Sequence, residues 1–131
     1  MTEANQAANA AAERAHSVTA LREARHLLAA GFSRGAVSRG YYAAFHAARA
    51  LLMERGVQTK SHDGLRRMLA LHLVKPGHFD PGTAEILARL ATKREDSDYA
   101  SDVPISQAEA EEAVVQAEVF ARAAGVVPGK P

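Results

Sequence analysis

Two polar residues stand out in the stretch SRGYYAAFHAARALL, residues 38–52, where Arg39 and His46 lie seven residues apart. On a helix this spacing places the two side chains nearly in line, about 10 Å apart along the axis. Arginine is a permanent cation, and histidine exchanges a proton near neutral pH. The pair is therefore either a candidate site or simply an interhelical histidine beside a surface charge.

Small residues surround these two side chains. Ala43, Ala47 and Ala50 lie between and beside them, and this face of the helix carries no Glu, Lys or Gln. A freely solvated helix face more often carries such residues, and alanines let another backbone or a ligand approach closely. We therefore expect the helix to have two working faces, one for its own core and one for a partner or a ligand.

A second polar pair lies in the stretch ATKREDSDYASD, where Arg94 and Asp98 are four residues apart. If a helix continues through Tyr99, both fall on the same stripe as Leu87 and Leu90. Charged groups on a core-facing stripe are costly unless they are paired, and the spacing allows a mutual salt bridge. The alternative is that the helix ends near Lys93 and an acidic loop follows.

Other polar groups give weaker signals. Lys60 and His62 flank Ser61 at the predicted start of a helix, where free backbone N–H groups can receive an anion. The six histidines form no convincing cluster and the chain has no cysteine. We predict no metal site and no cofactor.

The composition indicates what kind of element must position these groups. The chain has 131 residues, of which 47% are hydrophobic, with no Cys and no Trp. Alanine and leucine dominate, which favours helices, and the length fits one domain. No apolar run approaches the ~20 residues that a membrane span needs, and the N-terminus does not resemble a secretory signal. We expect a cytoplasmic protein without a membrane segment.

Charge is distributed unevenly along the chain. Residues 14–75 carry eleven basic and three acidic residues, whereas residues 76–131 carry five basic and ten acidic residues. This asymmetry can mean that one half faces a polyanion and the other a basic surface. It can equally mean that long helices have charged outer faces.

Start and stop signals divide the chain into five helical segments. The predicted helices run to Ala30 before Gly31, from Ser33 to Arg55 before Gly56, from Ser61 to Val74, from Asp80 and Pro81 towards Tyr99, and from Ser106 to Ala124 before Gly125. Ser106 and Glu109 form a capping box. Short connections predict an all-α, up-down four-helix bundle with an additional short helix. We expect a single domain, residues 1–131, with its core in 15–124 and a tail at 125–131.

The second helix has a predicted core face that spans about 120° of arc. Its residues are Val37, Tyr41, Ala44, Phe45, Ala48, Leu51 and Leu52.

Four blocks in order, SRGYYAAFHAARALL, KSHDGL, KREDSDY and AEVFARAAG, resemble the HEPN domain family over about residues 15–124. The resemblance implies a helical bundle that is usually a dimer and is often encoded beside a minimal nucleotidyltransferase. Many such domains are metal-independent RNases that act as toxins and are restrained by that partner. Their signature is Arg, four to six residues, then His, contributed by both protomers to one cleft. In some members a Tyr follows that His and is nucleotidylated.

This chain departs from the signature. At the corresponding place it has Arg94, three residues, Asp98 and Tyr99, so the histidine is absent. An aspartate is ionised near neutral pH and is a poor general acid beside RNA. We therefore interpret the chain as a dimeric binding module that partners a nucleotidyltransferase. The alternative is an endoribonuclease in which Arg94 stabilises charge and His46 transfers the proton.

These interpretations assign residues to roles. The catalytic candidates, if the chain is active, are Arg94, His46 and Asp98. The candidates for binding RNA or a nucleotide are Arg39, Tyr42, Arg49, Lys60 and His62, and Tyr99 is the candidate for modification. A third hypothesis is a purely structural helical dimer.

Overall fold

The computed structural model describes residues 2–99, 102 and 104–127. Within these residues the chain forms five α-helices and one π-helical segment, so the all-α prediction is confirmed. The elements are α1 (Glu3–Ala29), α2 (Ser33–Met53), α3 (His62–Leu69), η1 (Ala70–Val74), α4 (Pro81–Tyr99) and α5 (Gln107–Ala123). No helix in the described ranges is long and apolar enough to cross a membrane.

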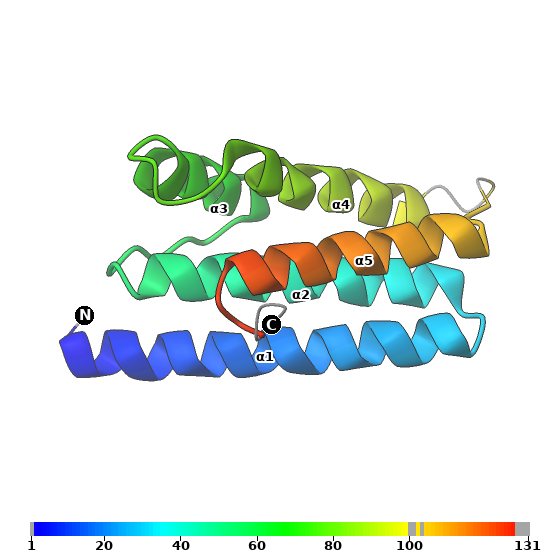
Figure 1. Cartoon of the computed structure of the whole chain (residues 1–131), viewed down its shortest axis with the longest axis horizontal. Helices are drawn as coiled ribbons and strands as arrows, with labels where there is room; N and C mark the ends of the chain where they lie inside the picture. The colour runs from blue at the N-terminus through cyan, green and yellow to red at the C-terminus, as the bar shows by residue number, and fades with distance from the viewer. Residues whose placement is uncertain (1, 100–101, 103, 128–131) are drawn as a thin grey trace.

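Helix α2 is the central element of the bundle. It packs against α1, α3, α4 and α5, and Figure 1 shows α1 below it, α4 above it and α5 in front of it. The core follows from this arrangement, because α2 contributes buried residues on both sides. Those that face the core as predicted are Val37, Tyr41, Ala44, Ala48 and Leu52, whereas Phe45 and Leu51 are only partly buried.

The alanines on the second face of α2 are buried within the bundle. Ala43, Ala47 and Ala50 are all buried, and the Ser17 hydroxyl of α1 donates a hydrogen bond of 2.7 Å to the Ala43 carbonyl. The expectation of a partner or ligand at these alanines is therefore wrong. The small residues allow the backbone of α1, in the same chain, to approach closely.

Local capping signals fix most helix starts. Ser61 accepts from the Gly64 N–H at 2.9 Å, Asp80 accepts from the Thr83 N–H at 2.8 Å, and Ser106 and Glu109 form the predicted capping box. Ser33 is the exception, because Phe32 is the N-cap of α2. The Ser33 hydroxyl instead donates to the side chain of Gln107 on α5 at 3.1 Å.

The third predicted helix changes its winding partway along. After Leu69 it continues as the π-helix η1, in which the Lys75 N–H donates to the Ala70 carbonyl. Within this segment Leu73 is buried and Leu71 is 49% exposed.

The predicted tail begins inside the fold. Val126 and Val127 pack against the core after Gly125, whose φ of 74° lets the chain leave α5 in a left-handed turn. Residues 128–131 of the predicted tail lie outside the described residues.

Candidate functional site

Five rings gather where α2 meets the start of α3. Tyr41, Tyr42, Phe45 and His46 lie on adjacent turns of α2, and His62 is the first residue of α3. The Tyr42 ring centroid lies 5.2 Å from Tyr41, 5.9 Å from Phe45, 6.4 Å from His46 and 6.3 Å from His62. We call these five residues the Tyr42 cluster.

Three guanidinium groups lie over these rings. Arg39 lies 4.9 Å from the Tyr42 centroid and Arg49 lies 5.6 Å from the Phe45 centroid. Arg94, from α4, lies 5.0 Å from Tyr41 and 5.6 Å from Tyr42. Each contact is a cation–π interaction, worth about 0.5 to 2 kcal/mol depending on solvent access. The arrangement places positive charge beside flat apolar faces, which is a combination that suits nucleic acid.

Arg94 reaches the cluster because α4 continues to Tyr99. The alternative, a helix that ends near Lys93, is therefore wrong. The Arg94 guanidinium forms the expected salt bridge with Asp98 at 3.2 Å, and the Arg94 side chain is only 15% exposed. Its Nε is buried and has no hydrogen-bond partner among the described residues. The salt bridge and two rings thus leave part of this cation unsatisfied.

His46 is held by a residue that the sequence analysis missed. Nδ1 of His46 lies 2.6 Å from Oε2 of Glu13 in α1, and the other oxygen of Glu13 lies 3.5 Å from Arg49. Glu13 is buried on the same stripe of α1 as Ala10 and Ser17. A single glutamate among alanines and serine on a core-facing stripe is the signal that could have identified it, because such a charge needs a partner.

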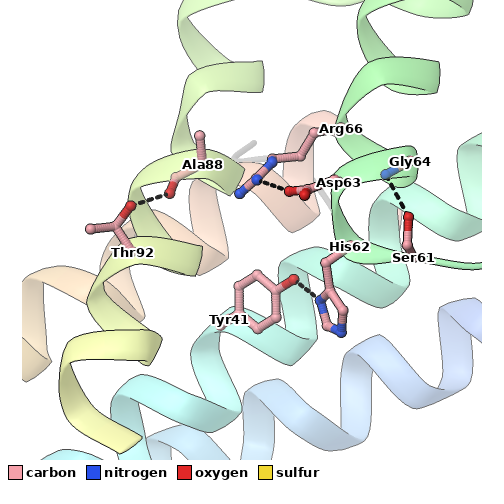
Figure 2. A network of polar contacts seen from close by, with 8 residues as sticks. All are labelled: Tyr41, Ser61, His62, Asp63, Gly64, Arg66, Ala88 and Thr92. Atoms are coloured by element: carbon pink, nitrogen blue, oxygen red, sulfur yellow. Dashed lines mark hydrogen bonds and ion pairs between the residues drawn. The ribbon is translucent and has the colours of Figure 1, made fainter. Parts of the chain in front are cut away.

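Tyr41 and His62 form a hydrogen bond at the floor of the cluster. Figure 2 shows their side chains facing each other between α2 and the start of α3. Burial raises the pKa of Tyr41 to about 12, against the opposing charge of Arg94. Burial, followed by the charges of Arg94 and Arg66, lowers the pKa of His62. Both groups are thus held neutral, and the tautomer of His62 decides which of the two donates.

The structure brings together six of the predicted site residues and separates others. These six residues belong to the Tyr42 cluster or lie over its rings: Arg39, Tyr42, His46, Arg49, His62 and Arg94. Asp98 contributes its carboxylate to Arg94. Lys60 is exposed in the loop before α3, and Tyr99 is 77% exposed at the end of α4. Arg94 and His46 do not touch one another, but both lie beside Tyr42.

One cavity lies outside this site. A cavity of about 480 Å³ between α4 and α5, lined by residues such as Leu90 and Ala113, shares none of the residues of the Tyr42 cluster. Within the described ranges, no group of three or more His, Asp or Glu side chains could hold a metal ion.

The comparisons with known proteins agree with the fold. The family model of the HEPN domain matches residues 9–126, so the chain belongs to the HEPN domain family. A protein of Methanocaldococcus jannaschii named "Putative toxin MJ0605" is 37% identical over 87 residues, which are 66% of this chain and 64% of that protein.

Two other relatives match shorter shares of their own length. A Pyrococcus horikoshii protein named "UPF0332 protein PH1297" is 43% identical over 61 residues, which are 47% of this chain and 43% of that protein. A second M. jannaschii protein, named "Putative toxin MJ0142", is 31% identical over 85 residues, 65% of this chain and 58% of that protein. The chain thus spans less than two thirds of the length of each of these curated relatives.

Proposed function

We propose that this chain is the HEPN member of a toxin–antitoxin-like pair and that it binds single-stranded RNA or a nucleotide along α2. The observation that carries the proposal is one stripe of α2 on which Arg39, Tyr42, His46 and Arg49 follow each other, with Arg94 of α4 over the Tyr42 ring. From Arg39 to Arg49 the stripe covers about 15 Å. The two M. jannaschii relatives that carry the word toxin in their names support the toxin–antitoxin setting.

The charges on this stripe are available to phosphate. Arg39 lies 3.6 Å from Glu23, and Arg49 lies 3.5 Å from Glu13, so both ion pairs are long. The Arg39–Glu23 pair is partly exposed on both sides, so it contributes little to stability and a phosphate can replace its carboxylate as the anion. Bases can then stack on the exposed parts of the rings, as they do in other proteins that bind single strands.

The proposed partner is a minimal nucleotidyltransferase, and the proposed active assembly is a homodimer in the cytoplasm. These two proposals rest on the family resemblance. Tyr99 is the proposed acceptor for nucleotidylation, and its exposed ring at the end of α4 leaves the hydroxyl accessible to a modifying enzyme. Lys60, exposed in the loop before α3, lies close in sequence to His62 and would extend the basic surface.

The binding proposal is tested by titrating a fluorescently labelled single-stranded RNA at several salt concentrations. Arg39→Ala should weaken binding roughly ten-fold and lower the slope of log affinity against log salt by about 0.7, the share of one phosphate contact. The matched control is Arg25→Ala, which removes the same charge from α1, where Arg25 pairs with Glu118 of α5. Equal losses in both variants would contradict a site on α2.

A second candidate function is metal-independent RNA cleavage. The observation that favours it is the Glu13–His46 hydrogen bond, because an imidazole oriented by a carboxylate is the usual form of a general base. Arg94, beside the same ring, would stabilise the charge that develops on the phosphate. Fragments with cyclic-phosphate ends, lost in both His46→Ala and Arg94→Ala, would establish cleavage. RNA that is bound and recovered intact would favour the binding module over the nuclease.

A further inference from the structure

Helix α5 carries an apolar stripe that the described part of the chain leaves exposed. Val115 is 50% exposed and Val119 is 40% exposed, and because they are four residues apart their side chains are neighbours on the helix surface. Ala108 and Ala123, which are also exposed, continue the stripe at its two ends. The stripe covers about 22 Å of the helix. In Figure 1, α5 crosses the front of the bundle, with α2 behind it and α4 above it.

The cavity between α4 and α5 lies beside this stripe. It has a volume of about 480 Å³, and its apolar floor includes Ile86, Leu90 and Ala113. Each of these three residues is at most 5% exposed, so the core of the bundle holds the floor in place. Glu112 lines the cavity and also lies on the stripe, three residues before Val115. The cavity and the stripe are therefore parts of one surface, which we call the α5 surface.

The charge that is left unpaired on the α5 surface is negative. Two glutamates of α5, Glu109 and Glu118, each pair with a base at 2.7 Å. Arg89, on the opposite wall of the cavity, pairs with a glutamate of its own helix. Glu111 and Glu112 are exposed and form no ion pair within the described residues. Two carboxylates therefore lie beside the apolar stripe without a cation.

These features together fit one kind of ligand. A stripe of apolar residues along an exposed helix matches the apolar face of a second helix, whose larger side chains can enter the cavity. A small molecule held in the cavity would leave the two valines of the stripe exposed. The two unpaired carboxylates attract Lys or Arg side chains on the flanks of such a helix, which favours the correct partner over an acidic one.

We propose that the α5 surface binds a basic amphipathic helix of a partner protein. Apolar residues of that helix, at helical spacing, would cover the stripe and enter the cavity, and its Lys or Arg residues would meet Glu111 and Glu112. The α5 surface shares no residue with the Tyr42 cluster, so this inference does not rest on the proposed binding of RNA. The bundle would have two binding surfaces, one for nucleic acid and one for protein.

The test titrates three labelled peptides of about sixteen residues, the length of the stripe, with the full chain. The first is an amphipathic helix of leucine and lysine, the second has the same composition in scrambled order, and the third has glutamate in place of lysine. Fluorescence anisotropy should show that the first peptide binds at least ten-fold more tightly than the other two. Equal affinity for the first peptide and either of the others would overturn the proposal.

Substitutions show whether the peptide binds at the α5 surface. Val115→Ser and Glu112→Lys should each weaken binding of the first peptide about five-fold, through lost apolar contact and through repulsion of lysine. Leu71→Ser is the matched control, because Leu71 is 49% exposed but lies on η1. It should leave the affinity unchanged. All three side chains are exposed, so the variants should fold as wild type does. Equal losses in Val115→Ser and Leu71→Ser would overturn binding at α5.

Sedimentation of the chain alone tests the other possible occupant, a second copy. Wild type and Val119→Asp should sediment alike, as expected when the stripe is kept for a partner. A wild-type dimer that becomes a monomer in Val119→Asp would assign the stripe to self-association and overturn the proposal. The RNA proposal is tested separately, because Arg39→Ala should weaken RNA binding and leave peptide binding unchanged, whereas Val115→Ser should do the reverse.

Discussion

Burial controls the protonation state of two residues in this cluster, Tyr41 and His62. Tyr41 is 2% exposed, and its hydroxyl is held neutral in its hydrogen bond with His62. His62 is kept neutral by burial and by two nearby arginines, Arg94 and Arg66. A charged His62 can only donate through Nδ1, and burial beside two arginines disfavours that charged form. The neutral ring is therefore part of what attaches the start of α3 to α2.

The pH dependence follows from this contact. The folded chain holds the pKa of His62 below its ordinary value of 6.5, so the unfolded chain binds more protons as the pH falls below 6.5. The stability that neutral His62 contributes is complete above that pH and is lost progressively below it. We expect the melting temperature to fall between pH 7.5 and pH 5, and to fall less in His62→Gln, as measured by circular dichroism.

The control for this prediction is His78→Gln, which changes an exposed histidine in the turn before α4. It should leave the pH dependence as in wild type. If His62→Gln and wild type lose the same number of degrees between the two pH values, the buried contact with Tyr41 does not govern the acid sensitivity.

At the scale of elements, α4 matters because its last turns carry Arg94 to the rings of α2. Some surroundings of Arg94 stabilise the folded chain and others destabilise it. The rings and Asp98 attract it, whereas its buried Nε is unsatisfied and its charge is largely removed from water. A cation in such a place contributes little net stability, which is what we expect of a group that serves a ligand.

Arg94→Met separates these two roles. Methionine keeps most of the side-chain length, and Asp98, which is 34% exposed, stays hydrated when its partner is lost. We predict that the free energy of unfolding in urea changes by less than about 1 kcal/mol, because the lost cation–π contacts are offset by the relief of the buried charge. Affinity for single-stranded RNA should nevertheless fall roughly ten-fold.

Arg89→Met is the matched control on the same helix, where Arg89 is exposed and pairs with Glu85. It should change neither quantity appreciably. A loss of several kcal/mol in Arg94→Met would mean that Arg94 is a structural residue. Unchanged RNA affinity would remove it from the binding surface.

The helix starts could be predicted from the sequence because they depend on neighbours in the chain. Ser61, Asp80 and Ser106 each satisfy a backbone N–H three residues ahead, so the pattern is local. Ser33 has the same chemistry but is turned to Gln107, 74 residues away, and no local rule predicts that contact. The length of α4 was left open for a similar reason, since its last turns depend on Arg94 packing against α2.

At the scale of the whole molecule, the predictions that failed depend on packing between residues that are far apart in the sequence. The small-residue face of α2 was correctly identified as a surface for close approach, but the approaching backbone is α1. The same contact brings Glu13 to His46, 33 residues later, and creates their 2.6 Å hydrogen bond. The sequence therefore predicts most of the candidate residues on α2 and α4, while the carboxylate that orients His46 emerges only from the assembled bundle.

Charge is also redistributed by folding. The basic and acidic parts of the chain meet where Arg25 of α1 pairs with Glu118 of α5. Part of the opposite charge of the two halves is therefore neutralised within the molecule. The cations over the Tyr42 cluster are held by rings and long ion pairs instead. The basic half of the chain thus retains partly exposed positive charge on α2, at Arg39 and Arg49, where the proposed RNA surface lies.

The most direct test of this surface is photo-crosslinking of a single-stranded RNA that carries 5-iodouridine, followed by identification of the modified peptides by mass spectrometry. Iodouridine reacts with aromatic side chains stacked on it, so adducts should fall on Tyr42, Phe45 or His46 and should be reduced in Arg39→Ala. Adducts confined to exposed rings elsewhere, such as Phe32, would contradict an RNA-binding surface on α2.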